Sequence, residues 1–156
     1  MSFRKLIPDV LTAWAKQHGF DCADINSRSN NGTSALMQAA MAGEVEILRV
    51  LLSAGADVNL LNDDENNALW FACVSNEKII VRELLKHNIH IDNQNVNAAT
   101  SLIYSASTGK FDIVKELVEA GADISKQTLD GYTALDSATT LSILKYLKPL
   151  YSAKSA

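Results

Sequence analysis

The chain repeats itself every 33 residues, and this periodicity constrains its fold more than any other feature. A leucine recurs at that spacing, at Leu36, Leu69, Leu102 and Leu135. A second short motif keeps the same period, in residues 24–26, 57–59, 90–92 and 123–125. A period of this length indicates an array of small units, each of which buries its apolar face against its neighbours.

Each unit has the pattern of two short helices. Small residues follow every repeated leucine, and small side chains at helical spacing let neighbouring helices approach closely. The next stretch carries an apolar stripe at amphipathic spacing, for example Val45, Leu48 and Leu52. Glycine or asparagine stands where each helix is expected to end in a left-handed residue. These positions are Gly43, Asn76 and Gly109 for the first helices and Gly55, Asn88 and Gly121 for the second.

Three segments carry a family likeness: Gly-Thr-Ser-Ala-Leu at 32–36, Ala-Gly-Ala-Asp-Val-Asn at 54–59 and Asp-Gly-Tyr-Thr-Ala-Leu at 130–135. In these segments, and in its period, the chain resembles the ankyrin-repeat family over roughly residues 20–150. The resemblance implies an all-α solenoid of stacked helix–turn–helix units. It also implies hairpin-like connecting loops, a concave face and capping repeats at both ends.

We predict a single ankyrin-repeat domain over residues 1–156, built from five units. They are an N-terminal cap at 1–28, full repeats at 29–61, 62–94 and 95–127, and a shortened C-terminal cap repeat at 128–156. In the N-terminal cap we expect two short helices, with Pro8 as the first residue of the second. In the C-terminal cap we expect the structure to end near Pro149.

Some residues depart from the family pattern. The proline of the usual repeat start is replaced by Ala35, Ala68, Ser101 and Ala134. Glu65 stands where the family has glycine, so the middle unit departs furthest.

The charge balance excludes several classes of partner. The 156 residues carry 14 Lys plus Arg and 18 Asp plus Glu, a formal net charge of −4. A mildly acidic chain without a basic cluster argues against nucleic acid and anionic membranes as partners.

No apolar run approaches the ~20 residues that cross a bilayer. Residues 1–9 lack the apolar segment of a secretory signal, so we expect a cytoplasmic protein.

No residue pattern points to catalysis, a metal or a cofactor. Phosphate loops, nucleophile elbows and zinc motifs are absent from the sequence. His87 and His90 lack two further ligands nearby, and we interpret them as surface or turn residues. Cys22 and Cys73 have no metal or disulfide spacing. We expect Cys73 to be a buried packing thiol and Cys22 to be more exposed.

The resemblance implies that a partner binds at the loop tips and on the exposed side of each first helix. By position, the candidates are Gln38, Met41, Asp63, Asp64, Asn66, Phe71, Val74, Asn97, Tyr104, Asp130 and Tyr132; Val96 and Leu129 are further loop-tip positions. Phe71, Val74 and Tyr104 would form an apolar centre beside acidic residues, as in an interface core with a polar rim. For Phe71 and Tyr104, packing between repeats is an equal alternative, and for Trp70 packing is the favoured interpretation.

We therefore predict a non-catalytic protein–protein interaction module, an adaptor or an inhibitor, that is monomeric when free. The acidic run at 63–65 indicates a solvated loop tip and favours a partner with a basic surface. The alternative is a structural or chaperone-like subunit of an obligate complex, and a bacterial immunity-type role is one further version.

Overall fold

The computed structural model describes residues 3–154, with side chains from Asp9 onward. Within that span it contains nine helices and no strand. The helices are α1 (Phe3–Gln17), α2 (Ala35–Ala42), α3 (Val45–Ser53), α4 (Ala68–Ser75), α5 (Lys78–Lys86), α6 (Ser101–Ser107), α7 (Phe111–Glu119), α8 (Ala134–Ser137) and α9 (Leu141–Lys154).

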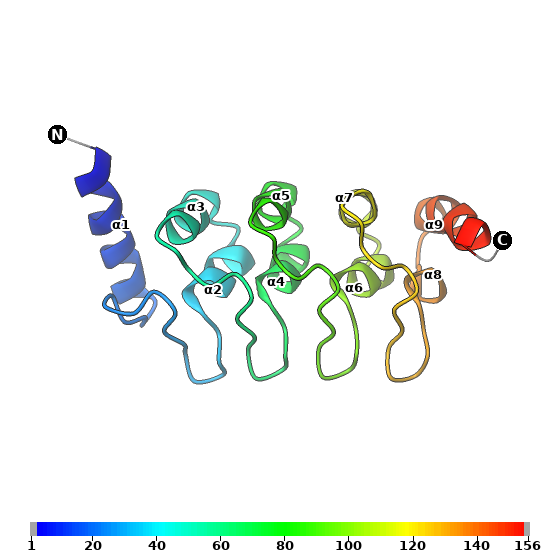
Figure 1. Ribbon diagram of the computed structural model, residues 1–156, viewed down its shortest axis with the longest axis horizontal. Helices are drawn as coiled ribbons and strands as arrows, with labels where there is room; N and C mark the ends of the chain where they lie inside the picture. The colour runs from blue at the N-terminus through cyan, green and yellow to red at the C-terminus, as the bar shows by residue number, and fades with distance from the viewer. Residues whose placement is uncertain (1–2, 155–156) are drawn as a thin grey trace.

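The helices form two rows that run the length of an extended molecule (Figure 1). One row consists of α2, α4, α6 and α8, and the other of α3, α5, α7 and α9, with α1 beside α3 at the N-terminal end. Four long loops project below the first row in this view; we call them fingers 1 to 4. They span residues 27–34, 60–67, 93–100 and 126–133. The predicted all-α solenoid is confirmed.

Every first helix begins at a polar capping residue, and these residues share the 33-residue period. The side-chain oxygen of each one accepts a hydrogen bond from the N–H three residues ahead. The caps are Ser34 (3.2 Å), Asn67 (3.3 Å), Thr100 (3.1 Å) and Thr133 (3.3 Å). The capping oxygen satisfies one of the backbone donors that a helix leaves unpaired at its start, which fixes where each finger ends.

The expected helix ends are confirmed. The backbone is left-handed after the first helices at Gly43 (φ 72°), Asn76 (φ 60°) and Gly109 (φ 73°). It is left-handed after the second helices at Gly55 (φ 89°), Asn88 (φ 58°) and Gly121 (φ 94°). Asparagine tolerates this conformation better than other side-chain-bearing residues, so the two asparagines replace glycine with little cost.

The core is one continuous column that passes through every repeat. The repeated leucines Leu36, Leu69 and Leu102 are at most 2% exposed, whereas Leu135 in the last unit is half-buried. In the second row, two equivalent positions are at most 1% exposed in each of α3, α5 and α7. They are Leu48 and Leu51 in α3, Val81 and Leu84 in α5, and Val114 and Leu117 in α7.

The expectation of two helices in the N-terminal cap is wrong, because α1 is a single helix that includes Pro8. Apolar residues recur at 6–7, 10–11 and 14–15. This spacing keeps the apolar positions in phase on both sides of the proline, which favours one continuous helix. In the described part, Trp14 and Ala15 are buried and Leu11 is half-buried.

The C-terminal cap extends further than expected. Helix α9 continues through Pro149 to Lys154. Beyond the proline, Tyr151 is half-buried and its hydroxyl donates a hydrogen bond to the Ile124 carbonyl. The contacts of Tyr151 favour continuation of the helix, although Pro149 cannot donate its own helical hydrogen bond.

Two fingers turn at strained residues, which leads to a testable prediction. The turn residue has positive φ in each finger: Gly32 (77°), Glu65 (62°), Ala98 (57°) and Gly131 (85°). A left-handed residue with a side chain destabilises the fold by about 1–2 kcal/mol. Glycine removes this strain, but its greater loss of chain entropy on folding offsets about 0.5–1 kcal/mol of the gain. Glu65→Gly and Ala98→Gly should each raise the free energy of unfolding in urea by about 0.5–1 kcal/mol.

The reciprocal control is Gly131→Ala. A Cβ at this position would meet no atom within 4 Å, so only backbone strain should act. We expect the free energy of unfolding to fall by about 1 kcal/mol. A loss of stability in Ala98→Gly would contradict this explanation.

Candidate functional site

The fingers are joined into one surface by hydrogen bonds between their tips. The N–H group of one tip donates to a carbonyl of the preceding tip: Asp63 to Asn31 (3.1 Å), Val96 to Asp64 (3.0 Å) and Leu129 to Asn97 (3.1 Å). Within each finger a further pair of backbone bonds closes the turn, for example Asn62 N–H to the Asn66 carbonyl (3.0 Å) and Glu65 N–H to the Asn62 carbonyl (2.9 Å). The tips are therefore held at fixed spacing and present their side chains as a set.

Equivalent tip positions change in character along the molecule. The position that donates the joining bond holds Asp63 in finger 2, Val96 in finger 3 and Leu129 in finger 4. Val96 is 48% exposed and Leu129 is 75% exposed, and Tyr132 near the same tip is 57% exposed. Fingers 3 and 4 therefore present an apolar area next to the acidic tip of finger 2.

The acidic tip carries uncompensated charge. Asp63 and Asp64 are exposed, and neither has an ion pair with any side chain that the structure describes. The same holds for Asp130 in finger 4, again within the described residues. Neighbouring unpaired carboxylates create a negative potential that attracts a cationic group.

The predicted residues of the first helices line the same side of the stack. Met41 on α2 is 42% exposed and Val74 on α4 is 38% exposed. Gln38 and Phe71 are half-buried. Helices α2 and α4 pack directly against each other, so these side chains come from adjacent units.

Tyr104 on α6 has two roles in the geometry. Its ring lies 4.7 Å from that of Trp70 on α4, between centroids, and therefore packs between repeats. The Lys110 Nζ lies 5.6 Å from the Tyr104 ring centroid and donates to the Val74 carbonyl at 3.0 Å. Burial raises the pKa of the Tyr104 hydroxyl. The contact of Lys110 was not predictable from the sequence, because only the chain reversal between α6 and α7 brings this residue back to Tyr104.

Asn66 lies in a different environment from the other candidates. It is only 8% exposed, and its Oδ1 accepts a hydrogen bond from Asn95 Nδ2 at 3.1 Å. Its N–H donates to Asn62 Oδ1 at 2.9 Å. Asn66 thus holds fingers 2 and 3 together, and its burial leaves little of it for a partner to contact.

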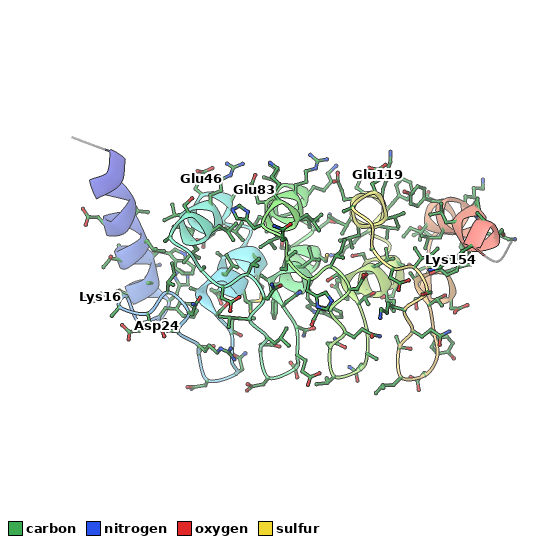
Figure 2. The ribbon with its side chains drawn as sticks, in the orientation of Figure 1. Lys16, Asp24, Glu46, Glu83, Glu119 and Lys154 are labelled. Atoms are coloured by element: carbon green, nitrogen blue, oxygen red, sulfur yellow. The ribbon has the colours of Figure 1, made fainter. Side chains whose placement is uncertain are left out.

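The opposite face, formed by the second helices, is charged and internally paired. Arg49 bonds Glu83 on the next repeat at 3.4 Å, and Arg82 bonds Glu116 one repeat further on. The Arg82 guanidinium lowers the pKa of Glu116 through its hydrogen bond. Glu46, Glu83 and Glu119 all lie along this row in Figure 2. Because the charges on this face largely satisfy one another, it offers less to a partner than the finger side.

The two thiols have the environments expected from the sequence. Cys73 is 0% exposed, and burial raises its pKa to about 11. Cys22 is exposed, and its S–H donates weakly to the Thr12 carbonyl at 3.5 Å. Within residues 3–154, no group of three or more His, Cys, Asp or Glu side chains is arranged to hold a metal ion.

The repeated caps, fingers and paired helices can be compared with known protein families. A family model for ankyrin repeats (3 copies) matches residues 8–95 and again residues 80–155. The chain belongs to the ankyrin-repeat family. Ankyrin repeats generally serve as protein–protein interaction modules and are typically non-catalytic. No curated protein matches the chain.

The ankyrin-repeat frame brings most of the predicted residues together on one side of the molecule. The predicted first-helix residues come from α2, α4 and α6, and the tip residues from fingers 2 to 4. None of the helices in the described part of the chain is long and apolar enough to cross a membrane.

Proposed function

We propose that this ankyrin-repeat chain binds a partner protein without catalysing a reaction, as an adaptor or as an inhibitor that occupies the partner's surface. The contact area, which we call the recognition surface, combines the finger tips with the groove side of the first helices. It comprises Gln38, Met41, Asp63, Asp64, Phe71, Val74, Val96, Asn97, Tyr104, Leu129, Asp130 and Tyr132.

The observation that carries this proposal is the row of exposed apolar side chains on adjacent fingers. Leu129 at 75% and Tyr132 at 57% are among the most exposed large apolar residues of the described chain. Contiguous exposed apolar groups with a polar border are typical of interaction sites. The backbone bond from Leu129 to Asn97 holds this area beside finger 3 without help from a partner.

The chemistry of the surface suggests a particular kind of partner. A basic group of the partner would face Asp63 and Asp64, and an apolar side chain would lie over Val96 and Leu129. Opposite charges at the edge speed association and fix orientation, while the apolar contacts slow dissociation.

We further propose that the free chain is a cytoplasmic monomer. Helices α1 and α9 lie at the two ends of the stack and shield the repeats between them, which supports a monomer. The two free cysteines agree with a reducing compartment.

The proposal can be tested by covalent cross-linking in native lysate followed by mass spectrometry. Leu129→Asp should abolish recovery of the partner, because it places a charge in the apolar area. The matched control is Leu141→Asp on α9, which alters an equally apolar residue, 65% exposed, outside the recognition surface.

Recovery of the same protein by the unmodified chain and by Leu141→Asp, but not by Leu129→Asp, supports the recognition surface. Equal recovery by all three proteins contradicts it. Light scattering on the purified chain tests the alternative: a stable monomer argues against an obligate subunit, whereas assembly only with a partner supports one.

A further inference from the structure

A solvent-open cavity of about 210 Å³ lies at the N-terminal end of the solenoid, away from fingers 2 to 4. It is lined by α1, the first residue of α2, α3 and the loop that follows α1. Its interior is mainly apolar, lined by Leu11, Ala15, Phe20, Ile25 and Leu51. Asp21, Cys22 and Asp24 lie at its exposed side.

The cavity exists because α1 lacks the large side chains that the other second-row helices place in the stack. Phe20 N–H donates to the Ala15 carbonyl at 2.8 Å, just as Ala56 N–H donates to the Leu51 carbonyl at 3.0 Å. Ala15 therefore occupies the position of Leu51, and Thr12 that of Leu48, one helical turn earlier. The next two repeats fill these positions with valine and leucine, all at 0% exposure. Among α1, α3, α5 and α7, only α1 has small residues at both positions, Thr12 and Ala15.

An extended loop forms the outer wall of the cavity. Compared with residues 55–59, the loop at 19–26 contains three additional residues, 21–23. The Asp21 carboxylate accepts the Ala23 N–H at 2.8 Å, and the Asp24 carboxylate accepts the Asn26 N–H at 2.9 Å. Neither carboxylate forms an ion pair with a side chain that the structure describes. Figure 2 shows Asp24 at the foot of α1, on the side toward the first repeat.

We propose that this cavity binds one large apolar side chain of a partner protein, with an adjacent lysine or arginine of that partner facing Asp21 and Asp24. The volume exceeds the roughly 150 Å³ of a cavity that holds benzene, yet is below the roughly 300 Å³ where pockets for whole small molecules begin. An aromatic or leucine-sized side chain therefore matches the space. The two unpaired carboxylates at the entrance supply the charge complementarity. That the occupant belongs to a protein rests on the proposed function, but the cavity is separate from the recognition surface.

Cys22 provides a direct readout of occupancy. It lies at the cavity and is exposed, whereas Cys73 is 0% exposed and should not react in the native protein. The rate of Cys22 alkylation by iodoacetamide, followed by intact mass, can therefore be measured with and without a peptide probe. We choose acetyl-Lys-Phe-Lys-amide, with the Lys-Ala-Lys and Glu-Phe-Glu peptides as controls.

At about 10 mM, the Lys-Phe-Lys peptide should slow Cys22 alkylation by about threefold or more, because one buried aromatic ring with an exposed ion pair supports a millimolar dissociation constant. Lys-Ala-Lys should give no protection and Glu-Phe-Glu much less. The double variant Asp21→Asn, Asp24→Asn should reduce protection by Lys-Phe-Lys toward that by Glu-Phe-Glu.

Filling the cavity provides the decisive variant. Ala15→Leu restores the side chain found at this position in the next three repeats and should abolish protection without lowering the melting temperature. Ala13→Leu makes the same change on an exposed residue of α1 outside the cavity and should leave protection intact.

Three outcomes would overturn the proposal: no protection by Lys-Phe-Lys, equal protection by Lys-Ala-Lys, or protection that persists in Ala15→Leu. Protection by free benzylamine but not by the peptide would also overturn it, and would assign the cavity to a small molecule. None of these outcomes bears on the recognition surface, because the cross-linking experiment with Leu129→Asp tests that surface independently.

Discussion

Replacing Phe71 with alanine should weaken binding of the partner by about 30-fold or more, since an aromatic residue near the centre of an interface commonly contributes about 2 kcal/mol or more. Phe71 lies on α4 beside Val74, and its half-buried ring leaves an exposed part for a partner to cover. The melting temperature should change little compared with the loss of affinity. Titration calorimetry with the purified partner, combined with thermal unfolding, measures both quantities.

The comparison with Tyr104→Ala separates recognition from packing. Tyr104 packs against Trp70 with the rings tilted at 42° and lies beneath Lys110, so its removal should lower both affinity and stability. Loss of the ring pair alone accounts for about 0.5–1.5 kcal/mol of stability. Glu46→Ala on the opposite face is the control and should alter neither quantity by more than the experimental error. A fall in melting temperature for Phe71→Ala, with unchanged affinity, would assign Phe71 to packing.

Leu84→Ala should have the largest effect on stability, a loss of about 3–4 kcal/mol in the free energy of unfolding. Leu84 is 0% exposed and lies on α5, which contacts both α3 and α7. The truncation leaves a cavity in the central unit, and in a stacked array that unit couples the two halves. We therefore expect urea unfolding, followed by circular dichroism, to become less cooperative as well as to begin at lower urea.

Leu147→Ala is the matched comparison at the end of the stack. Leu147 is also 0% exposed, but α9 lies at the end of the second row, beside α7. The Leu147→Ala variant should lose comparable packing energy, while the remaining repeats still unfold cooperatively. A single sharp transition in Leu84→Ala, with unchanged slope, would argue that the repeats are coupled more tightly than nearest-neighbour stacking requires.

The sequence predicted the features of the fold that depend on local chemistry. Helix ends at Gly43 and Asn88 follow from the need for a left-handed residue, and this need can be read from a single position. The buried leucines follow from the period. The continuity of α1 through Pro8 differs from the prediction, because proline favours a helix start whereas the apolar positions keep one phase on both sides of it.

The candidate surface was predictable by position but not in detail. Exposure of Leu129 at 75% follows from its place at a finger tip, which the repeat alignment located. The burial of Asn66 and the contact of Lys110 with Tyr104 depend on how one unit sits on the next. The N-terminal cavity depends on the same stacking, since Ala15 is unremarkable in the sequence until its register with Leu51 is known. Such inter-unit geometry has no signature within a single repeat.

The joints between finger tips have a consequence for how this scaffold can change. Each joint uses only backbone atoms, such as the Asp63 N–H and the Asn31 carbonyl. Any residue except proline supplies the same N–H, so the side chain at a tip can be exchanged while the neighbouring tips keep their places. Backbone atoms thus fix the spacing of the fingers, whereas side chains of the same residues determine binding specificity. Substitutions at the tips can therefore change the partner while the fold is kept.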